Sequence, residues 1–493
     1  MINKKIQHLF QKDDLQVSKP EKSRLNTDPH GSSEPKEGQV NRRSFLQKAG
    51  LGGISLAGMM ALPIEDTVAQ ATSKVNKNSN PSDLKITDMR IAQYGNVPLL
   101  KIYTNQGIHG LGDVRDGGDQ RFALMLKSRI LGENPCNVEK IFRRIDQFGW
   151  HGRQGGGVSG VEMALWDLAG KAHGVPLYQL LGGKYRDRVR IYVDTPTVQS
   201  PDEFASKMKD RVDQGFTLLK MDIGIGLIKD IPGALTNTEP WEPLRGWTDR
   251  DVTSYAQTMH PFTNIQISPL GIEKMVEYVA KAREQVGYQI PLAIDHFGHM
   301  GYNEMIKLAR AMEPYNIAWL EDLVPWQNTE QWLRITEAIA TPTLTGEDIY
   351  HKRNFKELIE KLAVDIVHPD PGSAGGYLQT KLIGDMAEEY GIGMAIHHAA
   401  SPVSFMGTVH QIAATYNFIG LEHHSVDNEW WEDLITGVPK PLVKDGYVTV
   451  PNTPGIGVEL NEDEVKKRLR KGEKFFAPTE EWNELRSWDR TWS

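Results

Sequence analysis

The stretch IPLAID, residues 290–295, is an apolar run that ends on an acid. Two further runs downstream do the same, NIAWLE (316–321) and TPTLTGE (341–347). Each run has the length and composition of a buried strand, and an amphipathic helical pattern follows each one. A carboxylate at the end of a buried strand needs a physical reason, and three acids at equal intervals indicate a common one.

The alternation of short apolar strands and amphipathic helices extends over residues 187–440. Eight strands can be counted: RIYVD, FTLLKMD, IPLAID, NIAWLE, TPTLTGE, AVDIVHPD, IGMAIHH and FIGLEHH. Repeated β–α units predict a parallel sheet, and seven or eight of them predict a closed (β/α) barrel of the TIM type. The active site of such a barrel lies at the carboxyl ends of its strands. Asp295, Glu321 and Glu347 end strands three, four and five, so we expect their carboxylates to converge.

The chain around the barrel divides into further segments. Residues 84–186 alternate in the manner of antiparallel strands and then turn helical, which predicts a small N-terminal α+β domain. An insertion at about 224–270, rich in Trp, Pro and charge, interrupts the barrel and is expected to form a lid or an oligomer contact. The C-terminal residues 441–493 are expected to pack on the α+β domain or on a neighbouring subunit.

Residues 1–71 are expected to lie outside the fold, as a disordered segment followed by a signal peptide. Arg42 and Arg43 precede a glycine-rich apolar run at 49–62 and the small-residue site Ala69-Gln70-Ala71. This is the pattern of a twin-arginine signal with its cleavage site. The alternative, a chance arginine pair before a membrane anchor, is weaker because a span needs roughly 20 apolar residues. We expect periplasmic export and no membrane span in the mature protein.

Charge and cysteine content limit the partners of the protein. The formal net charge of −8 argues against nucleic acid or an anionic membrane surface as the main partner. Cys136 is the single cysteine, so an internal disulfide is excluded. These observations leave a small-molecule substrate open, and we expect a homo-oligomer.

Three carboxylates that converge cannot all remain ionised and unpaired. Either they are partly protonated, or a cation holds them together. Oxygen ligands favour Mg²⁺, with Mn²⁺ as the alternative. The acids could instead cap the following helices, but three on consecutive strands favour a metal site. We therefore predict Asp295, Glu321 and Glu347 as metal ligands.

Together with these acids, ALWDLAGKAHGVPLYQLLGG (164–183), HPDPGSAGG and MAIHHAASP resemble the enolase superfamily, in its mandelate racemase/muconate lactonizing enzyme branch. The resemblance covers residues 84–440. It implies a capping domain that closes over the barrel and selects the substrate. It also implies that Asp370 orients His397 as a catalytic base, and that Glu422 donates a hydrogen bond to the substrate carboxylate.

The chemistry expected from these residues is proton abstraction next to a carboxylate. A divalent cation stabilises the enediolate that forms, and Lys220, at the end of strand two, can add a positive charge. His397 would take the proton while Asp370 fixes its tautomer. The His397–His398 doublet leaves His398 as a rival for the base.

Two departures from the family pattern bear on the reaction. The racemases carry Lys-x-Lys at strand two, whereas here Asp222 stands at the second position, either as a proton acceptor with an altered pKa or as a partner of Lys220. Dehydratases of the branch often carry Asp-x-His at strand three, where this chain has Phe297. The general acid therefore stays open among His296, His299 and His397.

We further expect His151 and Arg153, in WHGRQGGG (150–157), to line the substrate pocket. The predicted function is an exported, Mg²⁺-dependent lyase that dehydrates an aldonic or uronic sugar acid. Cycloisomerisation, epimerisation or racemisation at the same carbon is the near alternative. A non-catalytic exported protein that binds sugar acids is the alternative from another class.

Overall fold

The computed structural model describes residues 80–484, except for 197, 199, 238–264, 296–297 and 299. These residues belong to the compact unit Asn76–Ser493. The predicted signal segment 1–71, most of the predicted insertion, and His296, Phe297 and His299 lie outside the described residues.

Eight parallel strands form a closed barrel, because the last strand pairs with the first. The predicted barrel is therefore confirmed. The strands follow one another around the ring in chain order: β4 (Arg188–Thr195), β5 (Leu219–Asp222), β8 (Leu292–Asp295), β9 (Leu320–Glu321), β10 (Thr343–Thr345), β11 (Ile366–Val367), β12 (Gly393–Ile396) and β13 (Phe418–His423).

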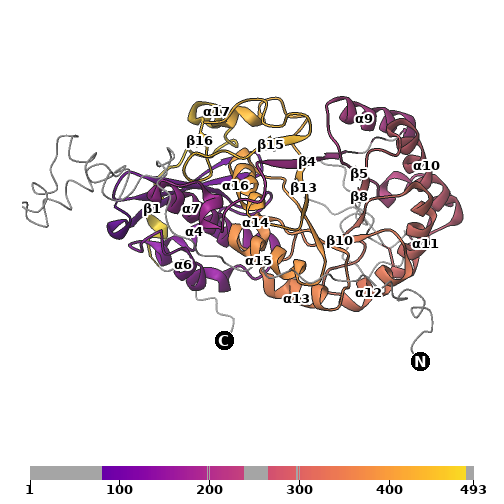
Figure 1. The fold of residues 1–493 in the computed structure, drawn as a ribbon, viewed down its shortest axis with the longest axis horizontal. Coiled ribbons are helices and arrows are strands. Elements are labelled where there is room, and N and C mark those ends of the chain that lie inside the picture. The colour runs from indigo at the N-terminus through magenta and orange to yellow at the C-terminus, as the bar shows by residue number, and fades with distance from the viewer. Residues whose placement is uncertain are drawn as a thin grey trace, which may run out of the picture. The chain divides into compact units, whose positions relative to one another are not determined.

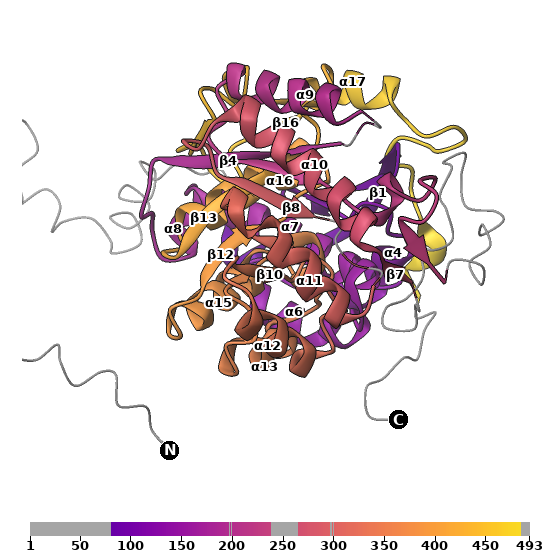
Figure 2. The same cartoon turned by 90° about the vertical axis from the view of Figure 1, so that its right-hand side faces the viewer.

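Helices follow the strands and lie outside them, as Figure 2 shows for α10 to α13 and α15. Ser200, Ser268 and Ser401 each precede a proline and accept a backbone N–H, so three of the helices begin with the same cap. The helices are α9 (Pro201–Asp213), α10 (Pro269–Val286), α11 (Tyr302–Met312), α12 (Thr329–Ala338), α13 (Lys352–Glu360), α14 (Pro371–Ala374), α15 (Tyr377–Glu388) and α16 (Pro402–Ala413), with the 3₁₀ turn η5 (Glu313–Tyr315) after α11.

The capping domain is an antiparallel sheet covered by helices (indigo to purple in Figure 1). Its long helix α7 packs on β3 at glycine contacts, where a Cβ on Gly112 would lie 2.3 Å from the carbonyl oxygen of Gly160. A side chain at Gly112 would therefore separate helix from strand. The elements are η1 (Pro81–Asp83), β1 (Ile86–Tyr94), β2 (Val97–Thr104), β3 (His109–Asp113), α4 (Arg121–Leu124), α5 (Lys127–Ile130), α6 (Val138–Ile145), η2 (Asp146–Phe148), α7 (Gly152–His173) and α8 (Leu177–Leu180).

A buried carboxylate connects the capping domain to the barrel. Glu162 of α7 accepts hydrogen bonds from the backbone N–H groups of Tyr377 and Leu378, at 2.8 and 3.0 Å. These N–H groups open α15 and favour the ionised form of Glu162, but burial outweighs them and raises its pKa to about 8. The indole of Trp166 donates to the same side chain. The cap is thus held against α15.

After β13 the chain returns to both domains. β15 (Tyr447–Thr449) pairs antiparallel with β4, and Arg470 donates its backbone N–H to Gln93 of the capping domain at 2.9 Å. Lys127 donates to the carbonyl oxygen of Thr479 at 3.1 Å. The other elements of this segment are η6 (Trp431–Leu434), β14 (Ile435–Thr436), β16 (Glu459–Leu460), α17 (Glu462–Lys467) and η7 (Glu480–Trp482).

The described ends of the insertion lie side by side. After η3 (Ile225–Leu227), β6 (Leu235–Thr236) pairs antiparallel with β7 (Gln266–Ile267) directly before α10. Among the residues that the structure describes, no helix is both long and apolar enough to cross a membrane.

Candidate active site

The alternation of side chains along the barrel strands creates the site. One inward-facing layer is apolar and includes Tyr192, Leu218, Ala293, Trp319, Leu344, Ile366 and Ala395. Side chains two positions further along a strand face the same way. Six of those seven positions are occupied by Asp194, Lys220, Asp295, Glu321, His368 and His397, and the seventh, after Leu344, by Gly346. The polar layer therefore rests on an apolar floor at the carboxyl ends of the strands.

Lys220 of β5 is fully buried among carboxylates. Its Nζ lies 2.8 Å from Oδ2 of Asp295 and 3.4 Å from Oε1 of Glu321, and it also contacts Glu422. Burial lowers the pKa of Lys220, but these three acids outweigh burial and raise it well above the ordinary value. Lys220 is therefore an ammonium. Asp222, the other strand-two residue, lies opposite Asp295 in the β5–β8 pairing.

The three predicted metal ligands lie in two overlapping groups that share Glu321. In one group, ligand atoms of Glu321, Asp295 and Asp322 lie within 4.8 Å of one another. In the other, those of Glu321, Glu347 and His368 do. Asp322 and His368 lie beside the predicted set. Burial lowers the pKa of His368, but Glu321 and Glu422, at 3.1 and 3.5 Å from its two ring nitrogens, outweigh burial and raise it to about 10, so Asp322 rather than His368 is the added candidate ligand. Trp319 supports the shared acid by donating its indole N–H to Glu321 at 3.1 Å.

Glycine positions the third predicted ligand. Gly346, directly before Glu347, has φ +147°, and a Cβ there would lie 2.7 Å from the ring of Phe355. The backbone thus passes close to the helix that follows β10 and delivers Glu347 to the barrel mouth.

The electrostatics of these acids fit a divalent cation. Burial raises the pKa of Asp322 to about 7, and the charges of Glu321 and Asp295 act in the same direction. Burial and then the neighbouring Asp348 raise the pKa of Glu347 well above its usual range. Oxygen ligands that repel one another in this way are stabilised by a cation, so the described residues can hold a divalent metal.

A histidine–aspartate pair lies beside this cluster. Nδ1 of His397 is 2.6 Å from Oδ2 of Asp370, and Nε2 is 3.1 Å from Oε2 of Glu347. Asp370 also accepts the backbone N–H of Gly372 and so caps α14. Burial, followed by the charge of Arg115, lowers the pKa of His397 well below its ordinary value. The imidazole is therefore neutral, as a proton acceptor must be.

The rival histidine faces elsewhere. Nε2 of His398 lies 2.9 Å from Oγ of Ser404, which donates to Asp113 of the capping domain. Burial lowers the pKa of His398 to about 4. The direction of the two side chains therefore favours His397 as the base.

Glu422 of β13 is completely buried and accepts from Tyr192 at 3.0 Å. Burial raises the pKa of Glu422, but Lys220 and then His424 outweigh burial and lower it well below the ordinary value. The predicted role of donating a hydrogen bond to a substrate needs a proton on Glu422, whereas these neighbours favour its ionised form.

The capping domain contributes a buried guanidinium that the sequence did not single out. Arg115 donates from Nε to Oγ of Ser373 at 2.9 Å, and Nη1 lies 3.2 Å from Oδ2 of Asp370. Nη2 lies 3.5 Å from Oε1 of Glu347. Arg115 thus contacts both the histidine–aspartate pair and the predicted metal site.

The other predicted pocket residues of the cap lie at the start of α7. His151 is exposed and directly precedes the helix. Nη1 of Arg153 lies 3.1 Å from Oδ2 of Asp116, and its Nε lies 3.9 Å from Oδ1 of Asp348, the residue after Glu347. Arg153 is therefore at the rim beside the end of β10.

Comparison with known families and structures identifies the architecture. Residues 203–464 match the family model described as Enolase C-terminal domain-like. Residues 67–182 match the N-terminal domain of mandelate racemase / muconate lactonizing enzyme. The chain belongs to the enolase superfamily. Its two domains are those of the mandelate racemase/muconate lactonizing enzyme branch, so the predicted family and the prediction of an enzyme are confirmed.

Several known proteins are similar to this chain over most of its length. The D-xylonate dehydratase of Haloferax volcanii is 32% identical over 84% of this chain and 96% of its own length. A D-galactonate dehydratase family member from Cellvibrio japonicus is 29% identical over 77% and 94%, respectively. A mandelate racemase/muconate lactonizing enzyme-like protein from Rubrobacter xylanophilus has a similar structure, with a TM-score of 0.69, 30% identity, and coverage of 80% of this chain and 100% of its own.

Glu321 belongs to both metal-binding groups, so its removal tests the site. We expect Glu321→Gln to lose most affinity for Mg²⁺ or Mn²⁺ in titration calorimetry, because the amide keeps the shape but removes the charge. Glu330→Gln is the control, since Glu330 is exposed on α12 and pairs with Lys361. Equal metal affinity in the Glu321→Gln variant and the wild type would contradict the assignment.

Proposed function

We propose that this enzyme is a metal-dependent sugar-acid dehydratase. It removes the proton next to the carboxylate of an aldonic or uronic acid and eliminates the hydroxyl group on the adjacent carbon. The observation that carries the proposal is the contact of His397 with Asp370 through one ring nitrogen and with Glu347, a candidate metal ligand, through the other. The names of the relatives, which include D-xylonate dehydratase, support elimination of water as the reaction.

In the reaction, Nε2 of His397 takes the proton from the α-carbon. The electron pair of the broken C–H bond passes to the carboxylate as an enediolate, whose charge the ammonium of Lys220 helps to stabilise. The pair then forms the carbon–carbon double bond as the β-hydroxyl group leaves, and the resulting enol becomes a 2-keto acid. A bound divalent cation supplies further electrophilic stabilisation of the carboxylate.

We propose Mg²⁺ as the resident ion, with Mn²⁺ as the alternative. The acids Asp295, Glu321, Asp322 and Glu347 present the oxygen ligands that these cations prefer. An ion held by carboxylates keeps coordination positions for the oxygens of a substrate.

Two alternatives are weaker on the residues present. Racemisation needs a base on each face of the α-carbon, and Asp222 stands where the racemases of the family have a second lysine. A protein that only binds sugar acids has no need for a base buried against an aspartate, yet His397 and Asp370 are each 3% exposed.

A substrate panel tests the function. The mature protein with Mg²⁺ should convert one or more aldonic or uronic acids to a 2-keto product, detected as a semicarbazone, and EDTA should abolish the conversion. A substrate deuterated at the α-carbon should react more slowly if proton abstraction limits the rate. Formation of an isomer without loss of water would replace dehydration by isomerisation, and binding without any turnover would favour the non-catalytic protein.

The base has its own test. His397→Asn should lose roughly 10²–10⁴-fold in kcat, the usual contribution of a general base, while metal affinity remains. Asp370→Asn should lose less, because the imidazole stays in place without its orienting charge. His398→Asn is the matched control and should retain most activity. An active His397→Asn enzyme together with an inactive His398→Asn enzyme would reverse the assignment.

We also propose that the protein is exported to the periplasm by the twin-arginine route. Arg42 and Arg43, the apolar run 49–62 and the small residues Ala69 and Ala71 support this proposal. This route carries folded proteins, which suits an enzyme that acquires its metal before export.

The arginine pair tests the export route. Changing Arg42 and Arg43 to lysine should leave the precursor in the cytoplasm, as judged by immunoblots of cell fractions. Arg24→Lys, upstream of the pair, should leave export unchanged. Mature protein in the periplasm of the paired-lysine variant would exclude the twin-arginine route.

A further inference from the structure

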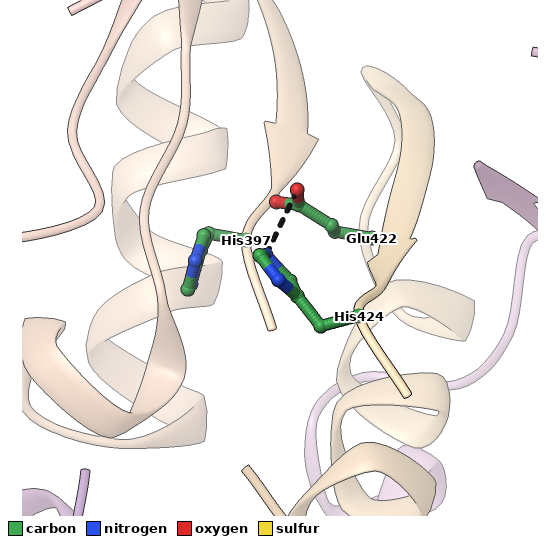
Figure 3. Close-up of side chains that lie close together, drawn as sticks. All are labelled: His397, Glu422 and His424. Atoms are coloured by element: carbon green, nitrogen blue, oxygen red, sulfur yellow. Dashed lines mark ion pairs between the residues drawn. The ribbon is translucent and has the colours of Figure 1, made fainter. Parts of the chain in front are cut away.

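His424 lies beside the proposed base at the mouth of the barrel. It follows Glu422 by two positions at the end of β13, so its side chain turns toward the same interior. Figure 3 shows the ring between Glu422 and the adjacent His397. Ligand atoms of these three side chains lie within 4.8 Å of one another. His424 is therefore the next side chain after Glu422 that faces the barrel interior.

Two carboxylates flank the ring of His424. Nδ1 lies 3.3 Å from Oδ2 of Asp194 at the end of β4, and Nε2 lies 3.1 Å from Oε1 of Glu422. An imidazole with a carboxylate at each nitrogen is stabilised in its doubly protonated form, because both N–H groups then face negative charge. Two carboxylates around one ring thus favour a proton over a metal ion on His424.

The neighbouring charges agree with this geometry. Burial lowers the pKa of His424, but Glu422 and then Asp194 outweigh it and raise the pKa to about 9. Lys220 opposes them, since its ammonium repels an imidazolium. Within the described residues, His397 also faces the ring, with ring centroids 5.3 Å apart. His424 is therefore protonated at neutral pH.

The two histidines are held in the same way. Nδ1 of His397 faces Asp370, and Nδ1 of His424 faces Asp194. In both cases Nε2 points to a second acid of the site, Glu347 or Glu422. The arrangement that orients a base on β12 is repeated on β13.

His424 and His397 differ in their access to solvent. The side chain of His424 is 31% exposed, whereas that of His397 is 4% exposed. A group that gives up a proton in every turnover must recover one from water, and the exposed ring at the rim can do so.

We propose that His424 is the general acid of the dehydration, with Asp194 as its positioning residue. This role rests on the proposed function. As the bond between the β-carbon and its hydroxyl oxygen breaks, that oxygen keeps the bonding pair and takes the proton from Nε2 of His424, leaving as water. The pair released from the α-carbon by His397 forms the new double bond. Solvent then reprotonates His424, and no oxidant or reductant is needed.

A change of leaving group tests the role. With the sugar acid that the wild type dehydrates best, His424→Asn should lower kcat by roughly 10²–10⁴-fold, the usual contribution of a general acid. The 3-deoxy-3-fluoro analogue should be affected far less, because fluoride leaves without a proton. Exchange of the α-hydrogen with deuterium from D₂O, followed by NMR, should persist, because proton abstraction does not use His424.

Two further variants complete the experiment. Asp194→Asn should reproduce the same selective loss more weakly, and it carries the test if His424→Asn does not fold. His173→Asn removes an exposed imidazole at the end of α7 and should change neither reaction.

Three results would overturn the role. Unchanged dehydration by His424→Asn would exclude His424 as the acid. Equal losses with the hydroxyl and fluoro substrates would show that it acts in binding or folding. Loss of α-hydrogen exchange would assign it to proton abstraction. If the wild type dehydrates no sugar acid, the proposed function itself fails, and the acid role fails with it.

Discussion

The buried ammonium of Lys220 is the charge on which the barrel mouth depends. Carboxylates removed from water are costly unless an opposite charge and hydrogen bonds replace the lost hydration. Lys220 provides that charge to Asp295 and Glu321 on one side and to Glu422 on the other. The first two acids are candidate metal ligands, and the third contacts His424, which in turn contacts Asp194. The ammonium of Lys220 therefore links the candidate metal ligands with the residues proposed to transfer protons.

Two adjacent strands carry the same histidine–aspartate contact, and we propose a different role for each histidine. β12 and β13 each carry a histidine whose Nδ1 faces an aspartate, but their surroundings differ. Arg115 faces Asp370 and, with burial, keeps His397 neutral. His424 has carboxylates at both nitrogens and no guanidinium beside it among its described contacts. Two residues of the same type can thus take opposite roles because the charges around them differ.

Much of the site could be predicted from the sequence because strand alternation is a local rule. Asp295, Glu321 and His397 each stand two positions after an inward apolar residue, and the barrel brings them together. Asp194 and His368 also stand two positions after an inward apolar residue, so the alternation of the sequence could have predicted both. Asp194 and His368 lie on other strands than Asp295, Glu321 and Glu347. The equal spacing that identified those three acids therefore did not include Asp194 or His368.

Other features depend on tertiary contacts that no local pattern contains. Arg115 lies in a loop of the capping domain, and its partners Glu347 and Asp370 are more than two hundred residues away in the chain. The choice between His397 and His398 depends on which ring faces the barrel interior. The family resemblance implies a hydrogen-bond donor at Glu422, which needs a proton. The ionisation of Glu422 depends instead on its contacts with Lys220 and His424, which no local pattern shows.

The reach of Arg115 across the domain boundary has a consequence for the evolution of such enzymes. The capping domain supplies a charge next to Asp370, the partner of the proposed base. An exchange of capping domains between relatives would therefore change the charge beside the proposed base. A cap that presents no guanidinium at this point would leave Asp370 and Glu347 without the charge that faces them in this structure.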